Sequence, residues 1–293
     1  MRRLLLLAAA LAAAAPAAAD AQTDPTQGVR VCIVDTGINA AHKEFAPGQL
    51  VGFWNFTDPA PRGQATKAFD PKHPPADGNG HGTLTASMAV GLNAVPAKTK
   101  SFAPGFRFAS AQVVTPAGSV SGDIAGAIRW CTDVIGAQVI NISIGTIVPV
   151  SYASQIAWAA DYEALAYARS KGVLVTVANG NGTGNLGLVP GDGASSNYAM
   201  SADTLAVGAS GAQAATVSYQ PEVAAQYSIT GPVHDNPDDY RTAGGTSFSS
   251  PLTAGFAARL VAEARSVGRD LKADALEALV KSAARDTAIP PFW

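Results

Sequence analysis

Charged residues are scarce in this chain. Asp, Glu, Lys and Arg together make up 14% of the 293 residues, and the formal net charge is −2. No run of five or six like charges occurs anywhere in the sequence. A surface that binds nucleic acid or an anionic membrane needs clustered basic side chains. The sequence therefore predicts no nucleic-acid partner and no electrostatic membrane anchor.

Cysteine is almost absent, and the two copies are Cys32 and Cys131. Neither has a second Cys or a His at the spacing of a zinc site. An oxidising compartment would permit a disulfide between them, whereas free cysteines also pack well inside a core. Because the sequence does not reveal their separation in space, both interpretations stay open.

Acidic side chains form no cluster with the spacing of a calcium-binding loop. The loop aspartates are scattered along the chain and are interpreted as solvated turn residues: Asp192, Asp203, Asp235, Asp238 and Asp239. We therefore expect no metal site built from side chains. A structural calcium ion held by backbone carbonyls would leave no trace in the sequence and stays open.

Long hydrophobic runs are also rare, and only the N-terminal one approaches the length of a membrane span. Residues 4–19 are apolar throughout and follow Arg2 and Arg3. These residues are mostly alanine, whereas a transmembrane helix needs about 20 strongly apolar residues. We therefore favour a signal peptide over an anchor, and we expect no stable membrane anchor elsewhere in the chain.

A signal peptide has a positive start, an apolar centre and small residues before its cleavage point, and this N-terminus has all three. We expect it to cover residues 1–21, with cleavage after Ala19 or Ala21. No repeat or linker divides the remainder, so residues 22–293 are expected to form a single domain. The mature protein would then be exported, to a periplasm or to the extracellular space.

Predicted strands and helices alternate along the chain. Short continuous apolar runs are typical of strands that are buried on both faces of a parallel sheet. Strands are expected at 29–34, 106–114, 138–144, 172–178, 204–207 and 226–229, and helices at 121–135, 154–170, 247–266 and 271–284. This alternation predicts an α/β fold with a doubly wound, mainly parallel sheet. Ligands bind such folds at the carboxyl ends of the strands.

Asp35 follows the first predicted strand, in the motif Val-Asp-Thr-Gly at residues 34–37. A carboxylate at this point would lie at the functional edge of the sheet. An aspartate before glycine is also a common turn residue, whose side chain bonds the following backbone. Asp-Thr-Gly occurs in aspartic proteases too, but those need a second such motif, and this chain has none.

His81 lies between two glycines in the motif Gly-Asn-Gly-His-Gly-Thr, at the start of a predicted helix. The positive end of a helix dipole disfavours an imidazolium ion, so we expect the ring to be held closer to its neutral form. A general base must be neutral to accept a proton. A loop histidine that only bonds backbone is the alternative interpretation.

Ser247 lies in the motif Gly-Gly-Thr-Ser-Phe-Ser-Ser-Pro, also at the start of a predicted helix. A serine there is a common helix N-cap. A nucleophile at this position would gain an unpaired backbone N–H that can donate to an oxyanion. Ser249 and Ser250 compete with Ser247 for this role, and the spacing alone excludes neither.

Together, these motifs resemble those of the subtilisin family of serine peptidases, the subtilases. Asp-Thr-Gly after an apolar strand, then Gly-His-Gly-Thr, then Gly-Thr-Ser-Phe-Ser-Ser-Pro occur here in the order of that family. The resemblance covers about residues 29–260. It implies a doubly wound α/β fold with a mainly parallel sheet of seven strands, flanked by helices.

The resemblance implies further site residues. The family has an asparagine after a glycine that follows a central strand, and Asn181 matches it within residues 177–182. Residues 139–145 resemble the strand that lines the substrate cleft, and residues 117–119 resemble the edge that pairs with substrate backbone. The substrate-binding residues expected from these matches are Ser143, Ile144, Gly145, Gly118 and Ser119.

The implied chemistry is hydrolysis of peptide bonds in protein or peptide substrates. Ser247 would attack the carbonyl carbon, His81 would carry the proton, and Asp35 would orient His81. Asn181 and the backbone N–H of Ser247 would stabilise the oxyanion. No cofactor is required. Because the expected cleft residues carry no charge, we expect broad specificity with an apolar preference.

Two other functions stay open from the sequence. An esterase would use the same triad, although the Gly-x-Ser-x-Gly motif of α/β-hydrolases is absent around Ser247. A catalytically weak binding protein would share the fold, although all four catalytic positions are occupied. Fewer than ten residues separate the expected signal peptide from the first strand, too few for the propeptide of many exported subtilases. Restraint by an inhibitor or chaperone partner is therefore a further open expectation.

Overall fold

The computed structural model describes residues 26–58, 65–95, 98–120, 122–149, 158–181, 194–210 and 221–284. The expected signal peptide lies outside these residues, as do the first residues of the helix predicted at 154–170 and the loop aspartate Asp192. Within the described part of the chain, no helix combines the length and the hydrophobicity needed to span a bilayer.

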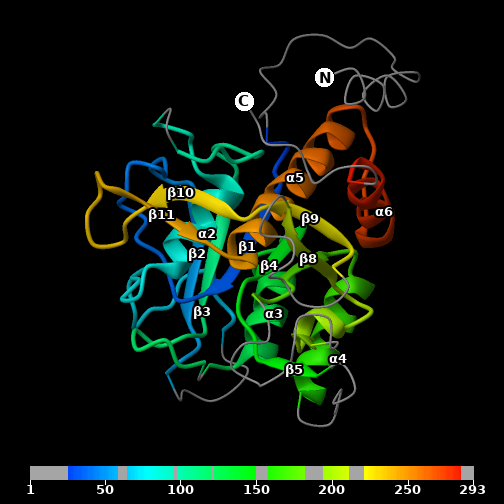
Figure 1. Ribbon diagram of the computed structural model, residues 1–293, viewed down its shortest axis with the longest axis horizontal. Coiled ribbons are helices and arrows are strands. Elements are labelled where there is room, and N and C mark those ends of the chain that lie inside the picture. The colour runs from blue at the N-terminus through cyan, green and yellow to red at the C-terminus, as the bar shows by residue number, and fades with distance from the viewer. Residues whose placement is uncertain are drawn as a thin grey trace.

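Seven parallel strands form the central sheet (Figure 1). Their spatial order is β2, β3, β1, β4, β6, β8 and β9. The bounds are β1 Arg30–Asp35, β2 Leu50–Asn55, β3 Arg107–Gln112, β4 Val139–Ile142, β6 Leu174–Ala178, β8 Leu205–Ser210 and β9 Val223–Gln226. Two small antiparallel pairs lie outside this sheet: β10 Ser228–Pro232 with β11 Tyr240–Gly244, and β5 Ile147–Pro149 with β7 Ala194–Ser196.

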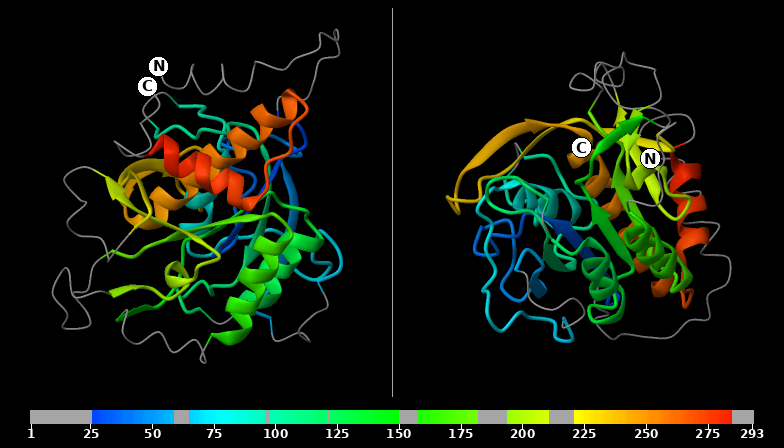
Figure 2. Two further views of the ribbon diagram at one scale, coloured as in Figure 1. Left: turned by 90° about the vertical axis from the view of Figure 1, so that its right-hand side faces the viewer. Right: turned by 90° about the horizontal axis from the view of Figure 1, so that it is seen from below.

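Helices cover both faces of the sheet, as the side view in Figure 2 shows. The bounds are α2 His81–Val90, α3 Ile124–Asp133, α4 Ala159–Ser170, α5 Thr246–Ser266 and α6 Ala273–Ala283, with a short 3-10 helix, η2, at Tyr198–Met200. Helices α2, α5 and α6 pack into the core on one face, and α3 and α4 pack into the core on the other. The predicted doubly wound α/β fold is confirmed.

Strand β1 lies at the centre of the sheet and faces both cores. Val31 and Ile33 are fully buried on the side of α2 and α5, whereas Cys32 and Val34 are fully buried on the side of α3. Alternate side chains of a strand point to opposite faces, so a strand covered on both sides has apolar side chains on both faces. Each such side chain stabilises the fold by about 1.5–3 kcal/mol.

The sheet reverses its winding direction between β1 and β4. From β1 the chain builds β3 and β2 on one side, and β4, β6, β8 and β9 on the other. The loops that follow β1 and β4 therefore lead to opposite sides and leave an opening between the carboxyl ends of these strands. Asp35 ends β1 and Ser143 follows β4, so the topology puts both residues at this switch point.

The strand predicted at 226–229 is wrong. Strand β9 ends at Gln226 and β10 begins at Ser228, so the two are separated at Tyr227. The backbone N–H of Gly245 donates to the carbonyl of Tyr227 at 3.2 Å, and the Tyr227 ring lies against Gly244. The chain turns at Tyr227 because it pairs with a distant segment, which local periodicity does not show.

Strand β2 was not predicted. Its sequence contains Gly52, and its pairing with β3 has a register shift between Leu50 and Gly52. A Cβ at Gly52 would collide with Ile135, so the glycine allows the edge strand to approach α3 and the loop after it. The other predicted strands and helices are all present, with ends that differ by a few residues.

A disulfide joins the two cysteines. Cys32 of β1 and Cys131 of α3 have Cα atoms 5.8 Å apart, and both side chains are fully buried. The bond links residues that are 99 positions apart, so it ties α3 to the centre of the sheet. Closing a loop of this length restricts the unfolded chain and contributes about 2–5 kcal/mol to stability. The structure thus decides between the two interpretations that the sequence left open.

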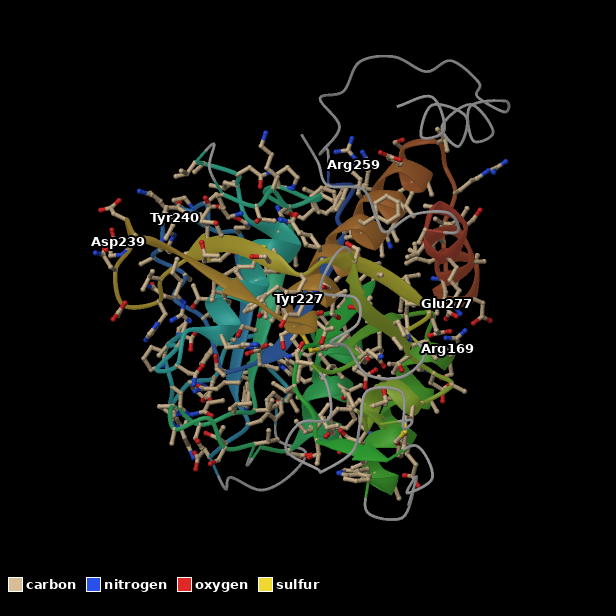
Figure 3. All side chains as sticks on the ribbon, in the orientation of Figure 1. Arg169, Tyr227, Asp239, Tyr240, Arg259 and Glu277 are labelled. Carbon is tan, nitrogen blue, oxygen red and sulfur yellow. A yellow bond between two sulfur atoms is a disulfide. The ribbon has the colours of Figure 1, made fainter. Side chains whose placement is uncertain are left out.

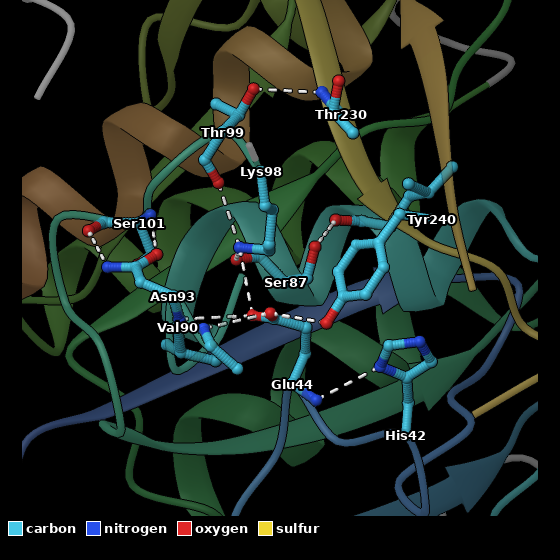
Figure 4. A network of polar contacts seen from close by, with 12 residues as sticks. His42, Glu44, Ser87, Val90, Asn93, Lys98, Thr99, Ser101, Thr230 and Tyr240 are labelled. Atoms are coloured by element: carbon cyan, nitrogen blue, oxygen red, sulfur yellow. Dashed lines mark hydrogen bonds and ion pairs between the residues drawn. The ribbon is translucent and has the colours of Figure 1, made fainter. Parts of the chain in front are cut away.

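A buried ion pair closes the C-terminal end of α2 (Figure 4). Nζ of Lys98 lies 3.2 Å from Oε2 of Glu44, and both side chains are fully buried. Lys98 also donates to the backbone carbonyls of Ser87 and Thr99, while Glu44 accepts a hydrogen bond from the Tyr240 hydroxyl at 2.9 Å. A cation therefore lies at the negative end of the α2 dipole, and the pair connects α2 to β11.

A second ion-pair cluster lies on the surface and joins α4 to α6 (Figure 3). Arg169 contacts Glu277 at 2.7 Å and Asp274 at 2.6 Å. Exposed pairs contribute little to stability, about 0–1 kcal/mol each. We interpret this cluster as fixing the orientation of α6, whose Leu276 and Val280 provide the buried contacts.

Candidate active site

Asp35 and His81 form a hydrogen-bonded pair at the carboxyl edge of the sheet. Nδ1 of His81 lies 2.8 Å from Oδ1 of Asp35. The carboxylate is fully buried, and it also accepts hydrogen bonds from the Thr36 backbone N–H and the Thr85 hydroxyl. Because a carboxylate only accepts, we assign the Nδ1 proton to His81 as the donor. In the neutral ring Nε2 then carries the free lone pair, as a general base requires.

Two glycines allow the Asp35 turn to meet the start of α2. A Cβ at Gly82 would collide with the backbone of Gly37, and a Cβ at Gly37 would collide with the carbonyl oxygen of Ala76. Gly37 also has φ of +115°, which side chains other than glycine rarely adopt. Gly37 and Gly82 are therefore explained by close backbone contact, and this contact brings Asp35 to His81.

The pKa of His81 lies above its ordinary value. Burial alone would lower this pKa, but the charge of Asp35 and its hydrogen bond raise it, and Asp77 adds a smaller effect in the same direction. The expectation that the helix dipole holds the ring closer to neutral is therefore wrong. The reason is that a helix end carries only about half a charge, whereas two full carboxylate charges lie beside this ring.

Ser247 lies in the first turn of α5, where its side chain is half-buried. Its hydroxyl donates to the backbone carbonyl of Ser143 at 3.1 Å. Among the described residues it forms no hydrogen bond with His81, although the next side chain, Phe248, has its ring 5.4 Å from the imidazole. Catalytic hydrogen bonds are often long or poorly aligned before substrate binds, so this geometry is compatible with Ser247 as a nucleophile.

The structure separates Ser247 from its two competitors. Ser249 and Ser250 are fully buried, and each hydroxyl is already bonded inside the protein. Ser249 donates to the carbonyls of Ala225 and Gln226, and Ser250 donates to the side chain of Asn141. A buried and bonded hydroxyl does not reach a substrate. Ser247 is the serine of this motif that is partly exposed, and it precedes Phe248, whose ring packs beside His81.

A buried polar network supports the start of α5. Asn141 of β4 donates to the Ser143 hydroxyl at 2.9 Å, and Ser143 donates in turn to the backbone carbonyl of Ser247 at 2.8 Å. The Asn141 oxygen accepts from Ser250 of α5 and from Thr176 of β6. These bonds join α5 to the centre of the sheet, so the position of Ser247 depends on β4.

Asn181 lies beside the first turn of α5. Its Oδ1 accepts hydrogen bonds from the Thr246 backbone N–H at 2.8 Å and from the Thr246 hydroxyl at 3.1 Å. An N–H can only donate, so the oxygen of the amide must face Thr246 and Nδ2 is left as a donor. Gly245, with φ of +149°, lies next to this amide, and a Cβ there would come within 3.3 Å of Nδ2. In the described chain, the Ser247 backbone N–H also has no acceptor.

The expected substrate-binding residues lie on both sides of the site. Ser143 touches Ser247 directly, Ile144 is half-buried, and Gly145 is exposed. The segment with Gly118 and Ser119 is exposed on the other side; Gly118 lies closest to Asn79, two residues before His81. The structure therefore places Ser143 against Ser247, and Gly118 near the loop that precedes His81. No described group of three or more His, Cys, Asp or Glu side chains is arranged to hold a metal ion.

The sequence analysis missed two buried polar residues at this site, Asp77 and Asn141. Asp77 precedes His81 by four positions, in the loop before α2, and no helix-capping pattern marks it in the sequence. Asn141 is a polar residue inside the apolar strand Val-Ile-Asn-Ile. Such a residue must find buried partners, and this requirement is the signal that was available.

A model described as the Subtilase family matches residues 26–291 of the chain. The chain belongs to the subtilase family. It is therefore a serine-type endopeptidase, a hydrolase.

Two related subtilases are similar over most of this chain. Thermitase from Thermoactinomyces vulgaris is 30% identical over 240 residues, which are 82% of this chain and 77% of thermitase. Alkaline elastase YaB from Bacillus sp. (strain YaB) is 30% identical over 245 residues, 79% of this chain. The match spans about half of the elastase, 53% of its length.

Solved structures confirm the fold of this subtilase. The crystal structure of a cold adapted subtilisin-like serine proteinase aligns with a TM-score of 0.65 and 23% identity, covering 94% of this chain and 92% of that one. The similarity at this identity concerns the architecture, the seven-stranded parallel sheet with helices on both faces.

Proposed function

We propose that this subtilase cleaves internal peptide bonds with Ser247 as nucleophile, His81 as general base and acid, and Asp35 as the residue that orients His81. The 2.8 Å hydrogen bond between Asp35 and His81 carries this proposal. It holds the ring so that Nε2 is the free nitrogen, at the strand edge where α5 presents Ser247. A buried carboxylate also stabilises the imidazolium that forms when His81 takes the proton.

The first step requires the Ser247 hydroxyl to leave the Ser143 carbonyl. In the free protein the hydroxyl donates to that oxygen, so its proton is not yet aimed at His81. Attack on a substrate carbonyl transfers this proton to Nε2 of His81, and the imidazolium later gives it to the leaving amine. A water molecule then repeats the sequence on the acyl-enzyme, with His81 again as the base.

We infer that Asn181 and the Ser247 backbone N–H form the oxyanion hole. The support is the orientation of the Asn181 amide, whose oxygen is bound to Thr246 and whose Nδ2 remains a donor. The Ser247 N–H belongs to the first turn of α5, where backbone donors have no partner within the helix. Two fixed donors stabilise the negative charge that develops on the carbonyl oxygen.

We further propose that the protein is exported and has a broad specificity with an apolar preference. A buried disulfide forms in oxidising compartments, which supports export together with the N-terminal sequence. Among the expected cleft residues, Ile144 has the one large side chain, and none is charged. A charged substrate side chain would find no partner there.

Hydrolysis of end-blocked peptides tests this function. The mature protein should cleave a mixture of such peptides at internal bonds, at many sequences and more often beside apolar side chains. Mass spectrometry of the products identifies each cut. Exclusive cleavage after Arg or Lys would contradict the specificity, and hydrolysis of matched esters without any peptide cleavage would contradict the peptidase function.

Activity should rise with pH and level off, with its inflection above pH 6.5. The base form of His81 is the active one, and Asp35 raises the pKa of His81 above its ordinary value. The active fraction therefore falls as the pH drops through this raised pKa, and it is largest on the alkaline side. Measurement of kcat/KM between pH 5 and 9 checks this; a rate that is constant from pH 5 to 8 would exclude His81 as the base.

A further inference from the structure

Asp77 is a second buried carboxylate beside the candidate triad. Its side chain accepts five hydrogen bonds, all from donors of the protein. The donors and distances are the Thr36 hydroxyl (2.9 Å), the Asn79 N–H (3.1 Å), the Gly80 N–H (2.7 Å), the Thr83 N–H (2.9 Å) and the Thr83 hydroxyl (2.7 Å). The side chain is almost completely enclosed, with 8% exposure for the residue. A site with five donors and no other acceptor is built for an ionised carboxylate.

These contacts join the two segments that carry Asp35 and His81. Thr36 follows Asp35 in the turn after β1, and its hydroxyl donates to Asp77 while it accepts the Gly82 N–H at 2.7 Å. Gly80 and Thr83 belong to the start of α2, on either side of His81. Asp77 therefore joins the turn that follows Asp35 to the start of α2, which carries His81. Among the described residues, its hydrogen bonds go to these segments and not to the side chains of Asp35 or His81.

Asp77 also supplies a fixed negative charge at the positive end of α2. Burial alone would raise the pKa of this carboxyl, but hydrogen bonds from Thr83, Gly80 and Asn79 outweigh burial and hold the pKa below its ordinary value. The group is thus ionised at every pH at which a histidine titrates. A carboxylate at a helix N-terminus offsets the dipole there.

The groups that act on His81 come from three sides. Asp35 at the end of β1 and Asp77 in the loop before α2 favour the imidazolium, and Arg241 on β11 opposes it. The His234 ring of the β10–β11 loop lies against Gly80, where a Cβ would collide with its Nδ1. Since Arg241 is exposed and screened by solvent, we expect the two buried carboxylates to dominate.

We propose that Asp77 is a positioning residue for His81: its buried carboxylate joins the turn after Asp35 to the start of α2, fixes the geometry of the Asp35–His81 pair and places a second negative charge near the imidazole. This inference rests on the proposed role of His81 as the base. It accounts for a pKa of His81 that is raised, although the helix N-terminus alone would lower it.

Neutral replacements of Asp77 test this role, because Asn and Ser both keep an oxygen that can accept hydrogen bonds from this loop. In Asp77→Asn and Asp77→Ser, kcat should fall by up to about 10²-fold from misplacement of the pair. The inflection of the pH profile should also move to lower pH, because one negative charge beside His81 is gone. Thr83→Val is the matched control: it removes a hydrogen bond to Asp77 and keeps the charge, so its inflection should stay in place.

A titration of His81 by NMR separates this inference from the proposed function. The titration is measured in the Ser247→Ala variant, so it does not depend on catalytic activity. When Asp77→Asn is added to this variant, the NMR signal of the His81 ring should titrate at lower pH. An unchanged His81 titration, or a shift to higher pH, would overturn the role of Asp77. If Asp77→Asn lowers the pH at which His81 titrates, but the protein with Ser247 cleaves no peptide, the role of Asp77 is supported and the peptidase function is contradicted.

Discussion

Ser247→Ala is expected to lower kcat for peptide hydrolysis by about 10⁶-fold, the loss typical of a subtilisin without its nucleophile. The remaining rate comes from substrate binding and the oxyanion hole. The hydroxyl of Ser247 makes one hydrogen bond, to the Ser143 carbonyl, so its removal should leave the fold intact. Hydrolysis of a denatured protein, together with thermal unfolding of both forms, measures the two effects separately.

Ser249→Ala is the matched control for this experiment. Ser249 lies two residues further along α5 and is fully buried, and its hydroxyl bonds Ala225 and Gln226 of β9. Its replacement should lower stability by about 1–3 kcal/mol and leave catalysis in place. A serine-directed phosphonate should modify Ser247 alone. Modification of Ser249 or Ser250 would reject the assignment, and equal inertness of wild type and Ser247→Ala would reject the peptidase itself.

Asn181→Ala should lower kcat by about 10²–10³-fold and change KM little. The amide donates to the oxygen of the substrate carbonyl mainly when that oxygen becomes negative, so its loss affects the transition state more than the bound substrate. Steady-state kinetics on one peptide gives kcat and KM separately. A rise in KM at constant kcat would show that Asn181 binds the ground state instead.

Asn181→Asp distinguishes the donor from the structural role of this side chain. Asn181 also holds Thr246 through Oδ1, so alanine removes that contact together with the donor. Aspartate keeps an oxygen toward Thr246 and replaces Nδ2 by a second oxygen, which cannot donate when ionised. A loss at least as large in Asn181→Asp as in Asn181→Ala assigns the effect to the donor. Near-normal activity in Asn181→Asp would exclude Asn181 from the oxyanion hole.

Most of the correct predictions rest on the pattern of apolar residues and glycines among near neighbours in the sequence. The apolar run of β1 identified a strand buried on both faces, because each residue of it faces one of two cores. The glycines around His81 were visible in the motif, although their reason, the close contact of Gly37 and Gly82, appears only in three dimensions. The strand predicted at 226–229 failed because a distant partner, β11, determines where β10 begins.

Contacts between distant segments account for what was missed. In the sequence Asp77 is indistinguishable from an ordinary loop residue. Its partner Thr36, in the turn after β1, is brought beside it only by the fold. The disulfide between Cys32 and Cys131 joins a strand to a helix that lies 99 positions away. Ser249 and Ser250 could be set apart from Ser247 only when β9 and β4 were seen to bind their hydroxyls.

The sequence by itself identified Asp35, His81 and Ser247 as candidate catalytic residues, through three motifs that occur in the order of the subtilase family. It also determined the alternation of strands and helices, because periodicity is a local property. Only the tertiary structure decided the direction in which the pKa of His81 is shifted. The helix N-terminus that was visible in the sequence favours a neutral ring, but electrostatic energy sums over all charges in space, and the carboxylates of Asp35 and Asp77 outweigh that helix end.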